Sequence, residues 1–168
     1  MKTRLSILVT ACLVAALGVG CGGVKIAVGN PAVSSETVLS ANKVSAVSVG
    51  TSAELQDDKQ ALITKNDVPN KMQVALMDSL KRGGYADASA GVLKVTVSIT
   101  EMRLPKNPGM GGPDHVAGTV TVTDAAGATL KTFEAQSTSA TGMFGASSRA
   151  SRFGTILSDF SQKIVNGL

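Results

Sequence analysis

The chain has 168 residues, with 16 Lys and Arg, 12 Asp and Glu, and only 3% aromatic residues. A small positive excess without basic runs argues against nucleic-acid binding, and so few aromatic side chains provide no platform for base stacking. The core must therefore be built mainly from Val, Leu, Ile, Met and Ala. The sequence predicts neither a nucleic-acid partner nor a cofactor.

The first 21 residues have the features of a bacterial export signal. Lys2 and Arg4 form a short basic start, residues 5–19 carry no charge, and small residues precede Cys21. A basic start, an apolar stretch and a small-residue cleavage site are typical of secretory signals. The motif Gly18-Val19-Gly20-Cys21 resembles a lipobox, which the bacterial lipoprotein transferase and signal peptidase recognise. This resemblance implies cleavage before Cys21 and lipidation of that cysteine.

Three alternatives stay open at this point. The motif Val9-Thr10-Ala11-Cys12 also fits the four-residue pattern, but it leaves a hydrophobic segment of residues 5–11 only. Simple secretory cleavage near Gly20 is the second alternative. An uncleaved spanning helix is the third, but it needs about 20 apolar residues, and the uncharged run is shorter and ends in glycines. We therefore favour lipidation at Cys21.

Lipidation would hold the protein on its membrane, because two or more acyl chains give stable anchoring where one gives marginal binding. Gly22 rather than Asp follows the cysteine, which by similarity to enterobacterial sorting favours the periplasmic side of the outer membrane. Removal of residues 1–20 leaves 148 residues, a common size for one domain, without a free thiol for disulfides, catalysis or metal binding. We expect a lipidated N-terminus, short strand or tether over 21–42 and a single domain over 43–168.

The first part of the mature chain contains weak patterns. Residues 24–28 alternate apolar and other side chains, which predicts a short strand close to the lipid. Residues 43–49 are apolar on both faces and predict a central strand. Residues 51–54 have the spacing of a helix capping box, but the segment after them has a weak apolar face. We expect a loop or a short helix there.

Stronger patterns follow. Residues 69–82 carry apolar side chains at intervals of three and four, with Pro69 at the start and Gly83-Gly84 after the end, which predicts a helix. Residues 93–100 and 116–123 alternate apolar and polar side chains and predict two strands.

The last third of the chain predicts a hairpin and a covering helix. Residues 124–127 place Asp and Gly at the first and fourth positions of a type I turn, which should lead into a strand over 129–135. Residues 137–148 form a loop of small residues, and the stripe that includes Phe153, Phe160 and Ile164 predicts a final helix.

This order predicts an α+β fold, a mainly antiparallel sheet with two principal helices packed on one face. The helix ending in Lys81-Arg82-Gly83-Gly84-Tyr85, the Gly-rich stretch before the strand at His115, and the amphipathic end resemble a group of bacterial lipoproteins whose common domain has no assigned activity. That group is similar to the amino-terminal domains of the curli secretion channel and of the Tol-system propeller protein. The resemblance covers residues 43–168 and implies a fold rather than an activity.

Candidate catalytic groups are few. His115 is the one histidine, and Asp114 beside it could orient it as a general base, but a polar residue at the start of a strand is the favoured interpretation. Arg149 and Arg152 open the last helix, where the dipole disfavours positive charge, and we interpret them as an exposed turn rather than a site for a phosphate or carboxylate. The sequence predicts no enzyme, with a His115-dependent hydrolase as the alternative.

A metal site is also disfavoured. Three methionines, Met102, Met110 and Met143, lie in the same part of the chain as His115, and thioethers favour copper(I). They form no close cluster, so ordinary core or loop methionines are favoured over a periplasmic metal carrier.

The sequence favours a lipid-anchored binding or accessory module whose partners are the membrane and cell-envelope proteins. The candidate interaction loop joins two predicted strands over residues 105–114, much longer than a hairpin requires. Long connections on a rigid sheet often carry binding residues. The candidate residues are Pro105, Lys106, Pro108, Met110 and Pro113.

Substitution of the lipidated cysteine tests the anchor. Cys21→Ser should abolish palmitate incorporation and release the protein from membranes, because the thiol that accepts the lipid is lost. Cys12→Ser is the matched control and should keep both. Metabolic labelling that persists in Cys21→Ser but disappears in Cys12→Ser would show that the other motif is used.

Overall fold

The computed structural model describes residues 42–106, 112–139 and 148–168. The first elements in chain order are strand β1 (Val44–Thr51) and helices α2 (Asp57–Lys65) and α3 (Val68–Arg82). They are followed by strands β2 (Leu93–Arg103), β3 (His115–Thr123) and β4 (Thr129–Thr138), and by helix α5 (Arg149–Gly167). The sheet order is β1-β2-β3-β4, with β1 parallel to β2 and the other neighbours antiparallel.

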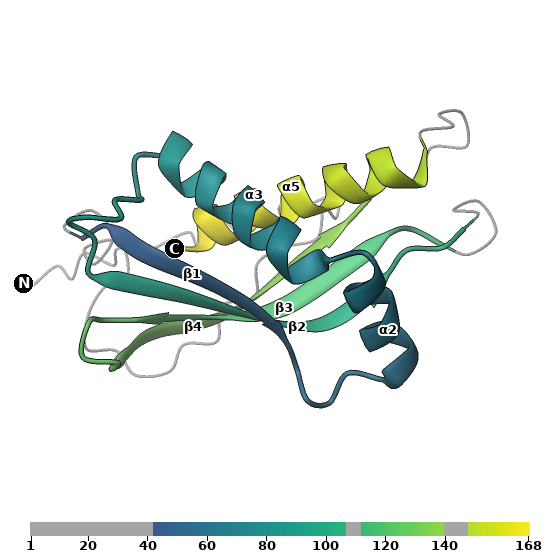
Figure 1. The fold of residues 1–168 in the computed structure, drawn as a ribbon, viewed down its shortest axis with the longest axis horizontal. Coiled ribbons are helices and arrows are strands. Elements are labelled where there is room, and N and C mark those ends of the chain that lie inside the picture. Colours follow the sequence, from purple (N-terminus) through teal and green to yellow (C-terminus); the bar gives the residue numbers. More distant parts are fainter. Residues whose placement is uncertain (1–41, 107–111, 140–147) are drawn as a thin grey trace, which may run out of the picture.

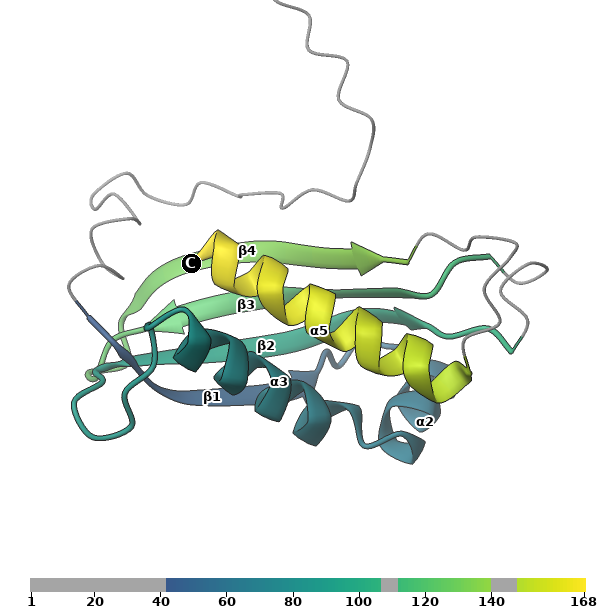
Figure 2. The same ribbon diagram turned by 90° about the horizontal axis from the view of Figure 1, so that it is seen from above.

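Helices α3 and α5 lie side by side across one face of the sheet, as Figure 1 and Figure 2 show. Helix α3 packs on β1, whereas α5 crosses β3 and β4. Helix α2 contacts α3 and β2 at one end of the sheet. The α+β class and the two principal helices on one face are therefore confirmed.

The alternation of buried and exposed side chains along the strands shows which face of the sheet the helices cover. In β3, every second residue from Val116 to Val122 is buried, and the residues between are partly exposed. In β2 the same alternation runs from Leu93 to Ile99, after which a register shift between Ile99 and Glu101 returns Met102 to the covered face. The predicted strands are confirmed, and β2 is longer than predicted because this shift keeps its apolar residues inward.

Strand β1 lies at the edge of the four described strands, so the prediction of a central strand over 43–49 is wrong. A register shift between Val44 and Ala46 places Val44 and Val47 on the same covered face. Ala46, on the other side of the strand, is exposed. Without this shift, strict alternation would place Val44 and Val47 on opposite faces, which is why both faces of the strand were predicted to be apolar.

The short-helix alternative is confirmed after β1, but the capping box is not. Helix α2 begins at Asp57, with Gln56 as N-cap and no side-chain capping bond. Thr51 ends β1 instead. The helix contributes buried Ile63 to the core, which accounts for its packing despite a weak apolar face.

The predicted hairpin between β3 and β4 is confirmed. Gly127 has φ of 86°, a conformation that glycine adopts without a steric penalty, and its N–H donates to the Asp124 carbonyl at 3.1 Å. The loop predicted over 137–148 begins later, because Ser137 and Thr138 belong to β4. Residues 140–147 and the strand predicted over 24–28 lie outside the described residues.

The sheet has two ends with different connections. We call the end at which β1 begins at Val44 the proximal end, since the chain reaches it from Cys21. The opposite end, where β2 finishes at Arg103 and α5 begins at Arg149, is the distal end. Figure 2 shows α2 at the distal end and the carboxyl end of α5 near the proximal end.

The core between sheet and helices contains two fully buried aromatic side chains, Phe133 of β4 and Phe160 of α5. Phe160→Ala should lower the free energy of unfolding by about 3–5 kcal/mol, because it removes a buried ring and leaves a cavity. Val74→Ala, at a position on α3 that is 56% exposed, should change it by less than about 0.5 kcal/mol. Denaturant unfolding of the protein beginning at residue 22 measures both. A midpoint that barely moves in Phe160→Ala would place α5 outside the core.

Candidate functional site

The connection between β2 and β3, predicted as the interaction loop, lies at the distal end of the sheet. In its described parts, Pro105 and Pro113 are half-buried and Lys106 is exposed. Pro108 and Met110 lie outside the described residues, so their role stays a prediction.

A buried ion pair holds this connection against α5. The Arg152 Nε donates to Asp114 Oδ2 at 2.9 Å, and the Asp114 side chain is completely buried while that of Arg152 is 13% exposed. The same guanidinium donates to the Pro105 carbonyl at 2.8 Å. One side chain thus contacts both ends of the connection.

Two further contacts complete a frame around the distal end. Arg149 donates to the Leu104 carbonyl at 2.9 Å, one turn before Arg152 on the same helix. The Ser139 N–H donates to the Asp114 carbonyl at 3.0 Å, which ties the end of β4 to the same point. Segments from β2, β3, β4 and α5 therefore converge on Asp114 and its neighbours.

The interpretation of Arg149 and Arg152 as an exposed turn is wrong for Arg152. The carboxylate and two backbone carbonyls offset the unfavourable position of both cations at a helix amino terminus. The partner carboxylate that the sequence analysis disfavoured exists within the chain itself, because tertiary contact brings Asp114 to the start of α5.

Asp114 does not orient His115, contrary to the pairing considered from the sequence. Asp114 lies just before β3, and its buried carboxylate is engaged by Arg152. His115 instead has its Nδ1 at 2.8 Å from Thr138 Oγ1 and its Nε2 at 3.4 Å from Glu101 Oε2. These three side chains come from adjacent strands on the face that α3 and α5 leave uncovered.

Glu101, His115 and Thr138 form a row in which a carboxylate, an imidazole and a hydroxyl follow one another. With the ring proton on Nε2 facing the carboxylate, Nδ1 can accept the Thr138 hydroxyl proton. A hydroxyl beside a base, with the base oriented by a third group, is the arrangement of an activated nucleophile. Arg103 lies next to this row, 3.6 Å from Glu101, and adds a positive charge.

The suggested metal ligands are separated by the sheet. Met102 is fully buried on the helix-covered face, whereas His115 lies on the uncovered face. These two side chains cannot share an ion. Met110 and Met143 lie outside the described residues.

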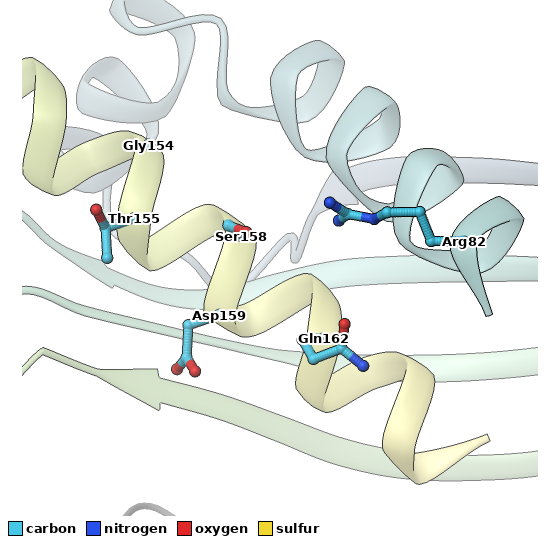
Figure 3. Close-up of a pocket in the computed structure, with 6 residues that line it drawn as sticks. All are labelled: Arg82, Gly154, Thr155, Ser158, Asp159 and Gln162. Carbon is cyan, nitrogen blue, oxygen red and sulfur yellow. The ribbon is translucent and has the colours of Figure 1, made fainter.

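A groove that the sequence analysis did not identify lies on the helical layer (Figure 3), with a volume of about 630 Å³. It is lined by Arg82 of α3 and by Gly154, Thr155, Ser158, Asp159 and Gln162 of α5. Figure 3 shows Asp159 pointing away from Arg82. The groove therefore offers hydroxyl and amide groups rather than a cluster of charges.

Asp159 is already engaged in holding α5 to β4. It accepts a hydrogen bond from Ser137 and pairs with Lys163 at 3.0 Å. Partial burial acts to raise the pKa of Asp159, but the bonds from Ser137 and Lys163 and the lysine charge outweigh it, so the pKa lies below its ordinary value. The carboxylate is thus a structural contact, and the groove is less promising than the distal end.

No family model matches the chain, and no curated protein is similar to it in sequence. Solved structures with a similar chain path include the PelC dodecamer from Paraburkholderia phytofirmans, at 16% identity and a TM-score of 0.48, covering 73% of this chain and 86% of PelC. Another PelC dodecamer structure, of a point variant, gives 15% identity and 0.48, covering 73% and 88%. Protein XCC0632 from Xanthomonas campestris, of the DUF330 family, gives 8% and 0.45, covering 58% of each chain.

Likeness at this level concerns the path of the chain alone, and no activity or assembly follows from it. The resemblance to the amino-terminal domains of the curli secretion channel and the Tol-system protein stays a prediction. Within the described residues, no helix is both long enough and apolar enough to cross a bilayer.

Sequence reasoning identified Asp114, His115 and Arg152 but assigned none of them its partner. Glu101 and Thr138 were not considered at all. The alternation of β2 and β4 would have placed both on the face of His115 had the register shift after Ile99 been known. Cross-strand partners depend on register, and no local pattern specifies it here.

The buried ion pair predicts a large difference between two arginines. Arg152→Met should lower the free energy of unfolding by about 3–5 kcal/mol, because it leaves the Asp114 carboxylate buried and unpaired. Arg149→Met, the same change at an exposed position, should cost at most about 1.5 kcal/mol, the scale of one hydrogen bond. Denaturant unfolding checks both.

Adding Asp114→Asn to Arg152→Met supplies the control. It should recover part of the loss, because the unpaired charge is then absent. Equal costs for Arg149→Met and Arg152→Met, with no recovery, would show that the pair does not hold the distal end.

Proposed function

We propose that this protein is a lipid-anchored component of the bacterial cell envelope that binds another envelope protein through the distal end of its sheet. The anchor is Cys21, and the binding residues are Lys106 and the neighbouring Pro105, Pro113 and Arg149. The protein acts by binding and not by catalysis.

One observation carries this proposal: the predicted interaction loop and the segment arriving from Cys21 meet opposite ends of the sheet. Strand β2 connects the two ends with 11 residues, which corresponds to about 36 Å at 3.3 Å per residue. The chain from the lipid thus enters the domain at the end opposite this connection, which leaves the distal end clear of the attachment point.

The frame around Asp114 supports a binding role. The Arg152 side chain fixes the first and last residues of the connection against α5. Pro105 and Pro113 restrict the backbone at the same two points. Fixing a binding segment before it meets a partner lowers the conformational entropy that binding removes.

The exposed charges beside the connection favour a partner with acidic groups. Lys106 and Arg149 are exposed, whereas the charge of Arg103 is partly offset by Glu101 at 3.6 Å. Cations at the rim of an interface contribute more to association rate and partner choice than to affinity.

A hydrolase is the second candidate, favoured by the short contact between His115 and the Thr138 hydroxyl. In this alternative Thr138 is the nucleophile, His115 the base and Glu101 the orienting group. The same row also fits a structural role, since polar pairs across neighbouring strands stabilise a sheet.

Photo-crosslinking from the distal end tests the binding function. A photoreactive amino acid at Lys106 should give a discrete crosslinked product with one envelope protein, identified by mass spectrometry. The same amino acid at Gln73, an exposed position on α3, is the matched control and should give none. Both variants should keep wild-type unfolding midpoints, because both positions are exposed.

Two results would contradict this function. Equal products from positions 73 and 106 would show that the distal end has no special role. Turnover of a p-nitrophenyl ester that is lost in both His115→Gln and Thr138→Val, in a protein without crosslinks at 106, would support the hydrolase instead.

A further inference from the structure

Exposed apolar side chains gather at the proximal end of the sheet. Among the described residues, the large hydrophobic side chains with substantial exposure are Val74, Tyr85, Val92 and Leu130. Val74 lies on α3, and the other three lie near the start of β1, β2 or β4. The two faces of the sheet do not explain this placement, because one face is covered and the other is polar.

Hydrogen bonds and strand register place these three residues along the same end of the sheet, from Tyr85 beyond β1 to Leu130 on β4. The Val92 N–H donates to the Lys43 carbonyl at 2.9 Å, and the Val44 N–H donates to the Tyr85 carbonyl at 2.8 Å. Both residues therefore border the point at which the chain enters the sheet. On the neighbouring strands, Lys94 pairs with Thr123, which pairs with Thr129 beside Leu130. Leu130 is thus two strands from β2, about 10 Å away.

Basic side chains surround the same end. Lys81 and Arg82 finish α3, and Lys43 and Lys94 lie at the starts of β1 and β2, all of them exposed. The Lys43 ammonium donates to the Gly84 carbonyl, which keeps it at the tip of the proximal end.

Two acidic side chains of the proximal end, Asp87 and Asp124, accept hydrogen bonds within tight turns of the chain. Asp87 accepts hydrogen bonds from the Ser89 hydroxyl and from the backbone of Ser89 and Ala90, and these bonds lower its pKa. Asp124 accepts from the Ala128 N–H at 2.8 Å in the hairpin turn. Lys131 of β4 also lies at this end, where it donates to the Gly167 carbonyl, and Asp78 is exposed near the end of α3. Five cations against three carboxylates leave this end positively charged.

The predicted anchor brings this end to a membrane. Cys21 precedes Lys43 by 22 residues, which can span at most about 75 Å. With Cys21 lipidated, a covalent link of at most this length would keep the proximal end near the membrane and raise the effective concentration of lipid there. At a high effective concentration of lipid, surface contacts can form that would be too weak to hold a free protein on the membrane.

We propose that the proximal end, formed by Tyr85, Val92, Leu130, Lys81 and Lys94, rests on the anionic headgroups of the membrane that holds Cys21. This inference depends on the lipid anchor of the proposed function. Tyr85 suits the headgroup region because its ring is apolar and its hydroxyl is polar. The lysines are attracted to anionic lipid, and salt weakens that attraction.

Spin labels on the lipidated protein test this docking. Val92→Cys and Val74→Cys form a matched pair, 42% and 56% exposed, and the sulfur of lipidated Cys21 is not free to react with the label. The protein is placed in vesicles of phosphatidylcholine with 30% phosphatidylglycerol. The label at position 92 should collide several-fold less with a water-soluble nickel chelate than the label at 74, and more with oxygen.

The charge contribution has its own variant. Lys81→Glu with Lys94→Glu should expose the label at position 92 to the chelate, as should vesicles of phosphatidylcholine alone. Lys59→Glu with Lys65→Glu, on α2 at the distal end, should leave it protected. Protection that survives the first double change would overturn anionic lipid as the occupant.

The outcomes separate docking from anchoring. Protein that floats with the vesicles but shows equal chelate access at positions 74 and 92 would overturn the docking and leave the anchor intact. Protein that does not float with the vesicles would overturn the anchor and the docking with it.

Discussion

The structure depends on the one-sided burial of its sheet. Alternate side chains of β3, and of β2 as far as Ile99, are packed beneath the helices, and the core has two fully buried rings, Phe133 and Phe160, among aliphatic residues. The uncovered face must then tolerate water, and one row across it consists of Ser48, Thr96, Thr121 and Thr132. With one face packed and the other polar, exposed apolar area is left to the ends of the sheet and the outer side of the helices.

The ion pair between Arg152 and Asp114 differs from the apolar core in its energetic cost and in its effect on geometry. Removing two charges from water is costly, and an apolar pair of similar volume is often as stable. The pair has a geometric consequence that an apolar contact lacks, because the guanidinium also donates to the Pro105 carbonyl and so fixes both ends of one connection. A directional contact of this kind sets the position of the segment relative to α5. That is the requirement of a surface that must meet a partner in one orientation.

The sequence predicts most of the helices and strands but not which residues pair across them. Periodicity placed the helix over 69–82 and the strands at 93 and 116 nearly correctly, because each has an uninterrupted apolar pattern. It failed for β1, where one register shift moved Val44 and Val47 to the same face. It failed again for Arg152, whose environment is set by a residue 38 positions away. Local patterns report burial, whereas pairings depend on register and topology, which no single segment determines.

The two proposed surfaces are compatible because of the distance between them. Screening at physiological salt limits charge interactions to about 8 Å, and the sheet separates its ends by about 36 Å. The distal cations Lys106 and Arg149 would therefore not be drawn to the headgroups proposed to contact the proximal lysines. Their charge would remain available to select a protein partner. The length of the strands would thus allow a single small domain to use positive charge at both ends. The membrane would not compete for the distal surface, and the protein partner would not compete for the proximal one.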